Sequence, residues 1–86
     1  MFNEIDSYIF GLNSRVKLLG DNSQIIQIVK KRKSRIIMKD GIQLLEIANS
    51  IHKVKPDYQI EVLVSGPVCS KTLKFLEDHN IMVVSD

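Results

Sequence analysis

The spacing of hydrophobic positions divides the second half of the 86-residue chain into clear elements. Apolar residues at 44, 47, 48 and 51 recur at i, i+3, i+4 and i+7, which predicts a helix over 41–54. Ile60 and Val62 flank Glu61 in an alternating pattern, and Ser65-Gly66-Pro67 follows as a tight turn, so 59–64 is predicted as a strand. A helix over 68–80 and a strand over 81–84 complete a strand–helix–strand unit, the usual source of parallel pairing.

A further strand is predicted ahead of the helix over 41–54. Arg35-Ile36-Ile37-Met38 is a short apolar run without alternation, which is typical of a central parallel strand covered on both faces. Asp40 follows as the expected N-cap of the helix. We therefore expect 36–38, 60–64 and 81–84 to be neighbouring parallel strands.

The first third of the chain gives a less decisive pattern. Asn3 precedes apolar residues Ile5, Ile9 and Leu12, which share one helical face and predict a first helix. Residues 15–19 fit a short strand or an extension of that helix. The apolar positions 25, 26, 28 and 29 favour a helix over 24–33, whereas a β-hairpin through 16–29 is the competing interpretation.

These elements predict a single α/β domain over residues 1–86. Helices on both faces of a mostly parallel sheet of three to four strands would make a small three-layer α/β/α sandwich. Hydrophobic residues make up 44% and charged residues 26% of the chain, a globular composition.

Composition also narrows the expected setting and chemistry. The net charge is +2, which permits a nucleic-acid partner without requiring one. A single cysteine and two isolated histidines favour a reducing compartment and give no metal-ligand spacing. No apolar run is long enough for a membrane span and the N-terminus lacks a signal-peptide pattern. We expect a cytoplasmic protein that contacts no membrane and needs no metal or cofactor.

The most informative prediction about function is where a site would lie. Ligands of open parallel sheets bind at the carboxyl ends of the strands, where helix N-termini also present unpaired N–H groups. Four segments are expected to meet there: 20–22, 39–40, 65–67 and the terminal 85–86. The candidate ligand-binding residues are Asp21, Asn22, Lys39, Asp40, Ser65, Gly66, Ser70, Lys71 and Thr72.

Residues 65–72 resemble a degraded phosphate-binding loop. The full motif has glycines where this chain has Ser65 and Ser70, and Pro67 removes a donor N–H. Nucleotide hydrolysis is therefore disfavoured, while an anion could still be held at the start of the following helix. Cys69 could act there as a nucleophile, but its spacing with Leu73 and Leu76 favours a buried, unreactive thiol.

The densest charged run lies in the middle of the chain. Its candidate nucleic-acid-binding residues are Lys30, Lys31, Arg32, Lys33 and Arg35. These cations could contact phosphates of RNA or DNA, or could simply gather at a helix C-terminus, which favours positive charge. The run contains no aromatic residue on which a base could stack.

The pattern as a whole favours a non-catalytic module that binds a phosphate-bearing partner, either a nucleic acid or a nucleotide-like small molecule. Two alternatives stay open. One is a structural or assembly protein that uses a protein partner or forms a homodimer through the N-terminal helix with Tyr8, Ile9 and Phe10. The other is a small-molecule enzyme with a pocket at the strand carboxyl ends that contains Asp40 or Cys69.

Overall fold

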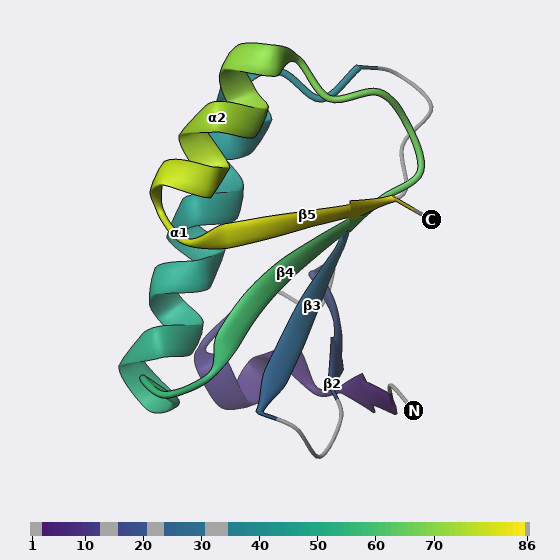
Figure 1. Ribbon diagram of the computed structural model, residues 1–86. Helices are drawn as coiled ribbons and strands as arrows, with labels where there is room; N and C mark the ends of the chain where they lie inside the picture. The colour runs from purple at the N-terminus through teal and green to yellow at the C-terminus, as the bar shows by residue number, and fades with distance from the viewer. Residues whose placement is uncertain (1–2, 13–15, 21–23, 31–34, 86) are drawn as a thin grey trace.

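The computed structural model describes residues 3–12, 16–20, 24–30 and 35–85. Within them five strands form one sheet, and the order of strands across the sheet is their order along the chain (Figure 1). One short 3-10 helix and two α-helices complete the fold. The elements are β1 (Asn3–Ile5), η1 (Ser7–Phe10), β2 (Lys17–Gly20), β3 (Ile25–Lys30), α1 (Met38–Val54), β4 (Gln59–Val64), α2 (Ser70–Asp78) and β5 (Ile81–Ser85).

The sheet is mixed rather than mostly parallel. β1 pairs with β2 and β2 with β3 in the antiparallel sense, whereas β3, β4 and β5 are parallel to one another. The predicted parallel neighbours 60–64 and 81–84 are confirmed by β4 and β5, joined through α2. The α/β class is therefore confirmed.

Both helices lie on the same face of the sheet (Figure 1). The β3–α1–β4 and β4–α2–β5 connections step across the sheet in the same direction, and two right-handed crossovers of that kind place their helices on one side. The described residues put no α-helix on the opposite face, so the expected three-layer sandwich is not confirmed.

The strand at the centre of the sheet is β3, and the prediction of a helix over 24–33 is wrong within its described part. Ile26 and Ile28 are buried under the helices, while Ile25 and Val29 lie partly buried on the other face. A strand that is apolar on both faces produces the same close spacing of hydrophobic residues as a helix. The competing hairpin through 16–29 is confirmed by the antiparallel pairing of β2 with β3.

The prediction of a strand at 36–38 is wrong, because the chain there makes one bridge and then enters α1. Ile36 forms an isolated parallel bridge with Val68, and Met38 begins the helix. The carboxylate of Asp40 accepts a hydrogen bond from the Ile37 N–H at 3.1 Å. Asp40 thus satisfies a free donor from inside the first turn, so the helix begins earlier than expected.

The predicted N-terminal helix is also wrong. β1 pairs with β2, and Asp6 then caps a single 3-10 turn by accepting from the Tyr8 N–H at 3.0 Å. Gly11 closes this turn with φ of 71°, a left-handed conformation that suits glycine. Tyr8 and Ile9 are exposed, whereas Phe10 is buried in the core and Ile5 and Leu12 pack against it.

The core lies between the sheet and its two helices. It consists of side chains from the inner face of the strands, from the buried stripes of α1 and α2, from η1 and from the segment before α1: Phe10, Leu18, Ile26, Ile28, Ile36, Leu44, Ala48, Ile51, Ile60, Val62, Val64, Leu76 and Ile81. Burial on this scale provides the main stabilising contribution and fixes where the ends of the parallel strands lie.

Candidate nucleic-acid interface

Three parallel strands end at one edge of the sheet. Lys30, Val64 and Ser85 are the last residues of β3, β4 and β5, and Lys30 pairs with Val64 while Val64 pairs with Ser85. The chain leaves this edge through connecting segments that lead to the starts of α1 and α2, which lie beside each other (Figure 1). This edge is the predicted location of a site.

The two loops that leave this edge are joined through their backbones. Ile36 donates its N–H to the Pro67 carbonyl, and Cys69 donates its N–H to the Ile36 carbonyl, each at 2.9 Å. The side chain of Ile36 is fully buried beneath this junction. The loops are therefore held in a fixed relation just before each helix begins.

Gly41 allows the first turns of the two helices to approach closely. A Cβ atom at this buried position would lie 2.8 Å from Cγ2 of Thr72 and 3.5 Å from a ring carbon of Phe75. Any larger residue would push α2 away from α1. Helix N-termini carry partial positive charge, so two of them placed close together attract an anion more strongly than one.

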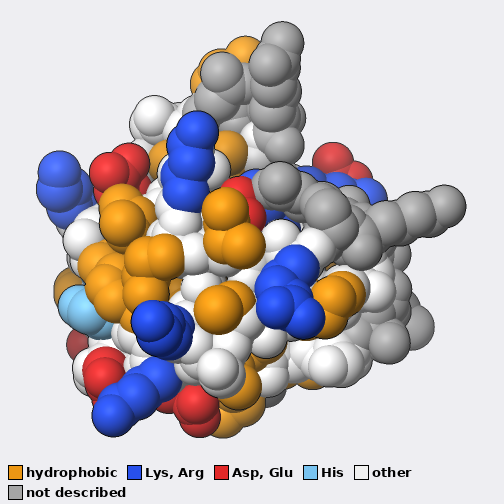
Figure 2. Space-filling model, turned by 90° about the horizontal axis from the view of Figure 1, so that it is seen from above, with side chains coloured by type: hydrophobic (Ala, Val, Ile, Leu, Met, Phe, Trp, Pro, Cys, Tyr) orange, Lys and Arg blue, Asp and Glu red, His pale blue; other side chains and the backbone are white. Residues whose placement is uncertain are grey.

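The side chains around the helix starts are mainly cationic. Arg35, Lys39 and Lys71 are exposed, and Lys30 is partly exposed at the end of β3. Within residues 35–42 and 65–74 the only acidic residue is Asp40, which is buried and accepts from the backbone. Figure 2 shows the end from which the helices begin, with Lys and Arg side chains spread among hydrophobic ones.

The structure separates the predicted site residues into an exposed group and a buried group. Lys39, Ser65, Ser70 and Lys71 are exposed, and Gly66 is partly exposed. Asp40 and Thr72 are buried in helix capping and packing, so neither side chain offers a surface to a ligand.

Other predicted residues do not reach this edge or lie outside the described residues. β2 runs antiparallel to β3, so its last residue, Gly20, lies beside Ile26 near the amino end of β3. The expectation that segment 20–22 meets the other loops therefore fails for Gly20, because the second strand is not parallel. Asp21, Asn22, Lys31, Arg32, Lys33 and the terminal Asp86 fall outside the described residues.

Cys69 differs from the expected buried thiol. It stands immediately before α2 and is partly exposed. The backbone N–H of Lys71, and then that of Thr72, lowers the pKa of the Cys69 thiol; partial burial opposes this effect, and Arg35 adds a smaller lowering effect.

No histidine stands near this thiol. The ring of His52 donates from Nε2 to the Tyr58 carbonyl at 2.8 Å, beyond the middle of α1 and close to its end. His79, at the end of α2, bonds through Nδ1 with the Phe75 carbonyl at 2.8 Å. Both rings form hydrogen bonds near helix ends at the other edge of the sheet. Neither ring is therefore placed to act as a general base for Cys69.

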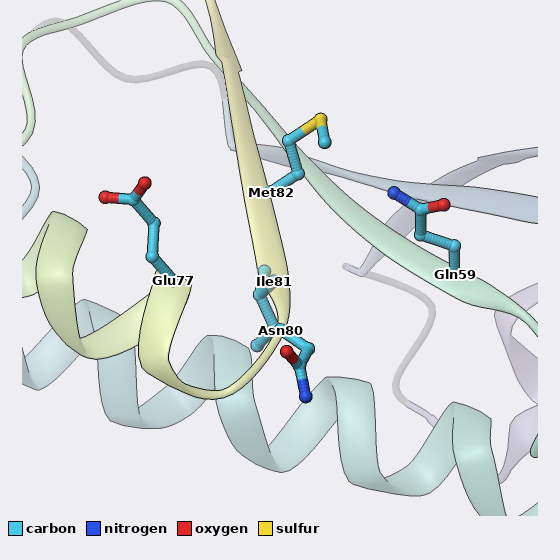
Figure 3. Close-up of a pocket in the computed structure, with 5 residues that line it drawn as sticks. All are labelled: Gln59, Glu77, Asn80, Ile81 and Met82. Carbon is cyan, nitrogen blue, oxygen red and sulfur yellow. The ribbon is translucent and has the colours of Figure 1, made fainter.

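Two hollows occur at the amino ends of the parallel strands, opposite the predicted site. One of about 390 Å³ is lined by Gln59, Glu77, Asn80, Ile81 and Met82 (Figure 3). The other, of about 340 Å³, is lined by Gln24, Val54, Lys55, Pro56, Asp57 and Tyr58.

Neither hollow has the features of a catalytic pocket. In Figure 3 the carboxylate of Glu77 and the amides of Gln59 and Asn80 are spread around the hollow and do not meet at one point. Neither lining contains Asp40 or Cys69, the residues expected in an enzyme pocket.

Sequence reasoning missed Gly41 and a group of exposed hydrophobic residues beside it. Ile37, Met38 and Ile42 are each more than a third exposed at the start of α1. An available signal was that these residues precede or fall off the stripe 44, 47, 48 and 51, so they could not all face the core.

Comparisons with protein-family models, curated proteins and solved structures give no significant match for this chain. Among the described residues, no cluster of His, Cys, Asp or Glu could hold a metal ion. No described helix combines the length and hydrophobicity needed to cross a membrane. A function is therefore proposed from the geometry of the edge where the parallel strands end and from the exposed Arg and Lys side chains around the helix starts.

Proposed function

We propose that this protein binds the phosphate backbone of nucleic acid at the carboxyl edge of its parallel strands. The observation that carries the proposal is the pair of helix starts held side by side by Gly41, with Arg35, Lys39 and Lys71 exposed around them. Cations and helix N-termini attract phosphate through the same electrostatic field.

An extended polymer suits this edge better than a nucleotide-sized molecule. Small ligands are usually enclosed by a concave pocket, and the two hollows that the described residues form lie at the opposite edge. Phosphates that follow a strand of nucleic acid need only a surface with cations at intervals. Lys30, at the end of β3, would extend that surface along the same edge.

The interface would recognise the backbone rather than the sequence of bases. Residues 30–42 and 65–74 contain no aromatic side chain, so base stacking has no platform there. Affinity would then come mainly from counterion release and would fall steeply with salt.

A salt series tests the proposal by fluorescence anisotropy with labelled duplex DNA and single-stranded RNA. Contact with three or four phosphates gives a log–log slope of about −3 on duplex DNA. The variant R35Q/K39Q/K71Q should flatten that slope to about −1 or less. A separate variant with Gln in place of Lys30, Lys31, Arg32 and Lys33 tests the charged run. It should remove most of the affinity that Arg35, Lys39 and Lys71 do not provide.

The matched control is K53E/K55Q, which lowers the net charge by the same amount at exposed lysines near the end of α1, away from this edge. It should leave the slope close to that of the wild type. Equal losses in this control and in R35Q/K39Q/K71Q would show that binding depends only on net charge. No detectable binding to either nucleic acid at low salt would refute the proposed function.

A further inference from the structure

The two edge strands of the sheet differ in how they are protected against pairing with another chain. β1 is three residues long and carries Glu4, whereas β5 spans Ile81–Ser85 with no charged residue and no proline. Charges, prolines and short length are the usual means by which an edge strand avoids association. β5 has none of them, and among the described residues no strand pairs with its outer side.

The side chains of β5 leave apolar surface on both faces at this edge. Met82 is 50% exposed, and Val83 and Val84 are partly exposed. A partner strand would cover these side chains while its backbone hydrogen bonds satisfied the outer N–H and carbonyl groups. Surface of this kind is expected to be buried in an assembly.

We propose that β5 pairs antiparallel with β5 of a second copy of this chain, so that the two sheets become continuous. In a pairing centred on Val83, Met82 of one copy lies opposite Val84 of the other, and Val83 meets Val83. No charge faces a like charge across this pairing, which makes the strand compatible with itself.

Charges on α2 support a second copy as the occupant. The contact of Gly41 with Thr72 and Phe75 places α1 against one flank of α2. Lys74 and Glu77 lie on the other flank by helical spacing, which is the outer side above β5. Antiparallel β5 strands would make the two α2 helices antiparallel, setting Lys74 of each copy against Glu77 of the other.

The same contrast between edges favours a closed dimer over a filament. Head-to-tail growth would require β5 to pair with β1 of the next copy, and β1 offers only three residues with Glu4 exposed among them. Pairing of β5 with itself is isologous and uses up the accessible edge of both copies.

Sedimentation equilibrium of the whole chain tests this inference. The wild type should be dimeric, and Met82→Lys should raise the dimer dissociation constant about tenfold or more. Met38→Lys is the matched control, because it adds the same charge at another exposed methionine away from β5, and it should leave the constant unchanged. Circular dichroism checks that both variants stay folded.

Charge reversal on α2 distinguishes this dimer from other modes of association. Lys74→Glu and Glu77→Lys should each weaken the dimer, since each places like charges across the axis, and the double variant should restore it. A chain that is monomeric at every concentration would overturn the inference. Equal effects of the Met82 and Met38 variants, or single reversals that the double variant does not repair, would also overturn it.

Discussion

At the carboxyl edge of the parallel strands two helices begin against each other, whereas at the amino edge the same helices end beside two hollows. The first edge is held by the bridge from Ile36 to Val68 and by the Gly41 contact, and its exposed charges are mainly positive. At the second edge, His52 and His79 form hydrogen bonds with backbone carbonyls near the helix ends. Asp57 and Glu77 also lie at this edge, together with lysines.

The difference shows that the two hollows and the group of exposed cations around the helix starts lie at opposite edges of the sheet. The two described hollows lie where helix C-termini and acidic side chains would repel an anion, whereas the described parts of the loops at the carboxyl edge are joined through their backbones. This separation favours contact with an extended backbone over enclosure of a small anion. The following predictions test it, beginning with the largest expected effect.

Gly41→Val should disturb the carboxyl edge most strongly. Its Cβ would overlap Cγ2 of the stiff, buried Thr72, so α2 must move or the first turn of α1 must distort. We expect a loss of about 2 kcal/mol in unfolding free energy, measured by urea denaturation. Gln43→Val, at an exposed position of the same helix, controls for helix propensity and should cost about 0.5 kcal/mol or less. Equal losses would show that the close approach of the helices has no energetic importance.

Two variants compare the start of α1 at one edge with its end at the other. The first is Asp40→Ala. It removes the acceptor of the Ile37 N–H and should cost about 1 kcal/mol. His52→Ala removes the hydrogen bond to the Tyr58 carbonyl and should cost about 0.5 kcal/mol, since that bond is only partly buried. A larger loss for His52→Ala in thermal unfolding would reverse the comparison and place the better-fixed edge at the amino ends.

Alkylation of Cys69 measures the field at the start of α2. The Lys71 and Thr72 N–H groups lower the pKa of its thiol, so the alkylation rate of the native chain should reach half its maximum at a lower pH than that of the unfolded chain. The shift also adds stability above the unfolded thiol's pKa, which is lost as the pH falls through the folded value.

The chain has one cysteine, so mass spectrometry after iodoacetamide treatment reports this site alone. The same titration in urea provides the unfolded reference. A native midpoint at or above the unfolded one would show that the start of α2 does not favour an anion.

Sequence reasoning located the carboxyl edge because the strand–helix–strand pattern over 59–84 is strongly periodic. Ile60, Val62 and Val64 face the helices on one side, and the turn at Ser65-Gly66 fixes where β4 ends. The same reasoning failed in the first third, where Ile25, Ile26, Ile28 and Val29 are apolar on both faces of β3. Their spacing alone does not distinguish a strand from a helix.

The missing third layer and the role of Gly41 follow from contacts between elements far apart in sequence. Nothing in 81–84 shows that β5 would be an edge strand, because that depends on the direction of two successive crossovers. The close contact of Gly41 with Thr72 joins two helices separated by β4. Local pattern carries no information about such contacts, although it did place Lys39, Ser70 and Lys71 at the same edge.

The most direct test of the proposed function is to map the bound surface by nuclear magnetic resonance. Adding a short DNA duplex to isotope-labelled protein at low salt should shift the backbone amide signals of Arg35, Lys39, Ser70 and Lys71. The amides of Gln59, Asn80 and Met82, which line the hollow at the other edge, should stay in place. Shifts confined to the amino edge, or spread evenly over both edges, would contradict a phosphate-binding surface at the helix starts.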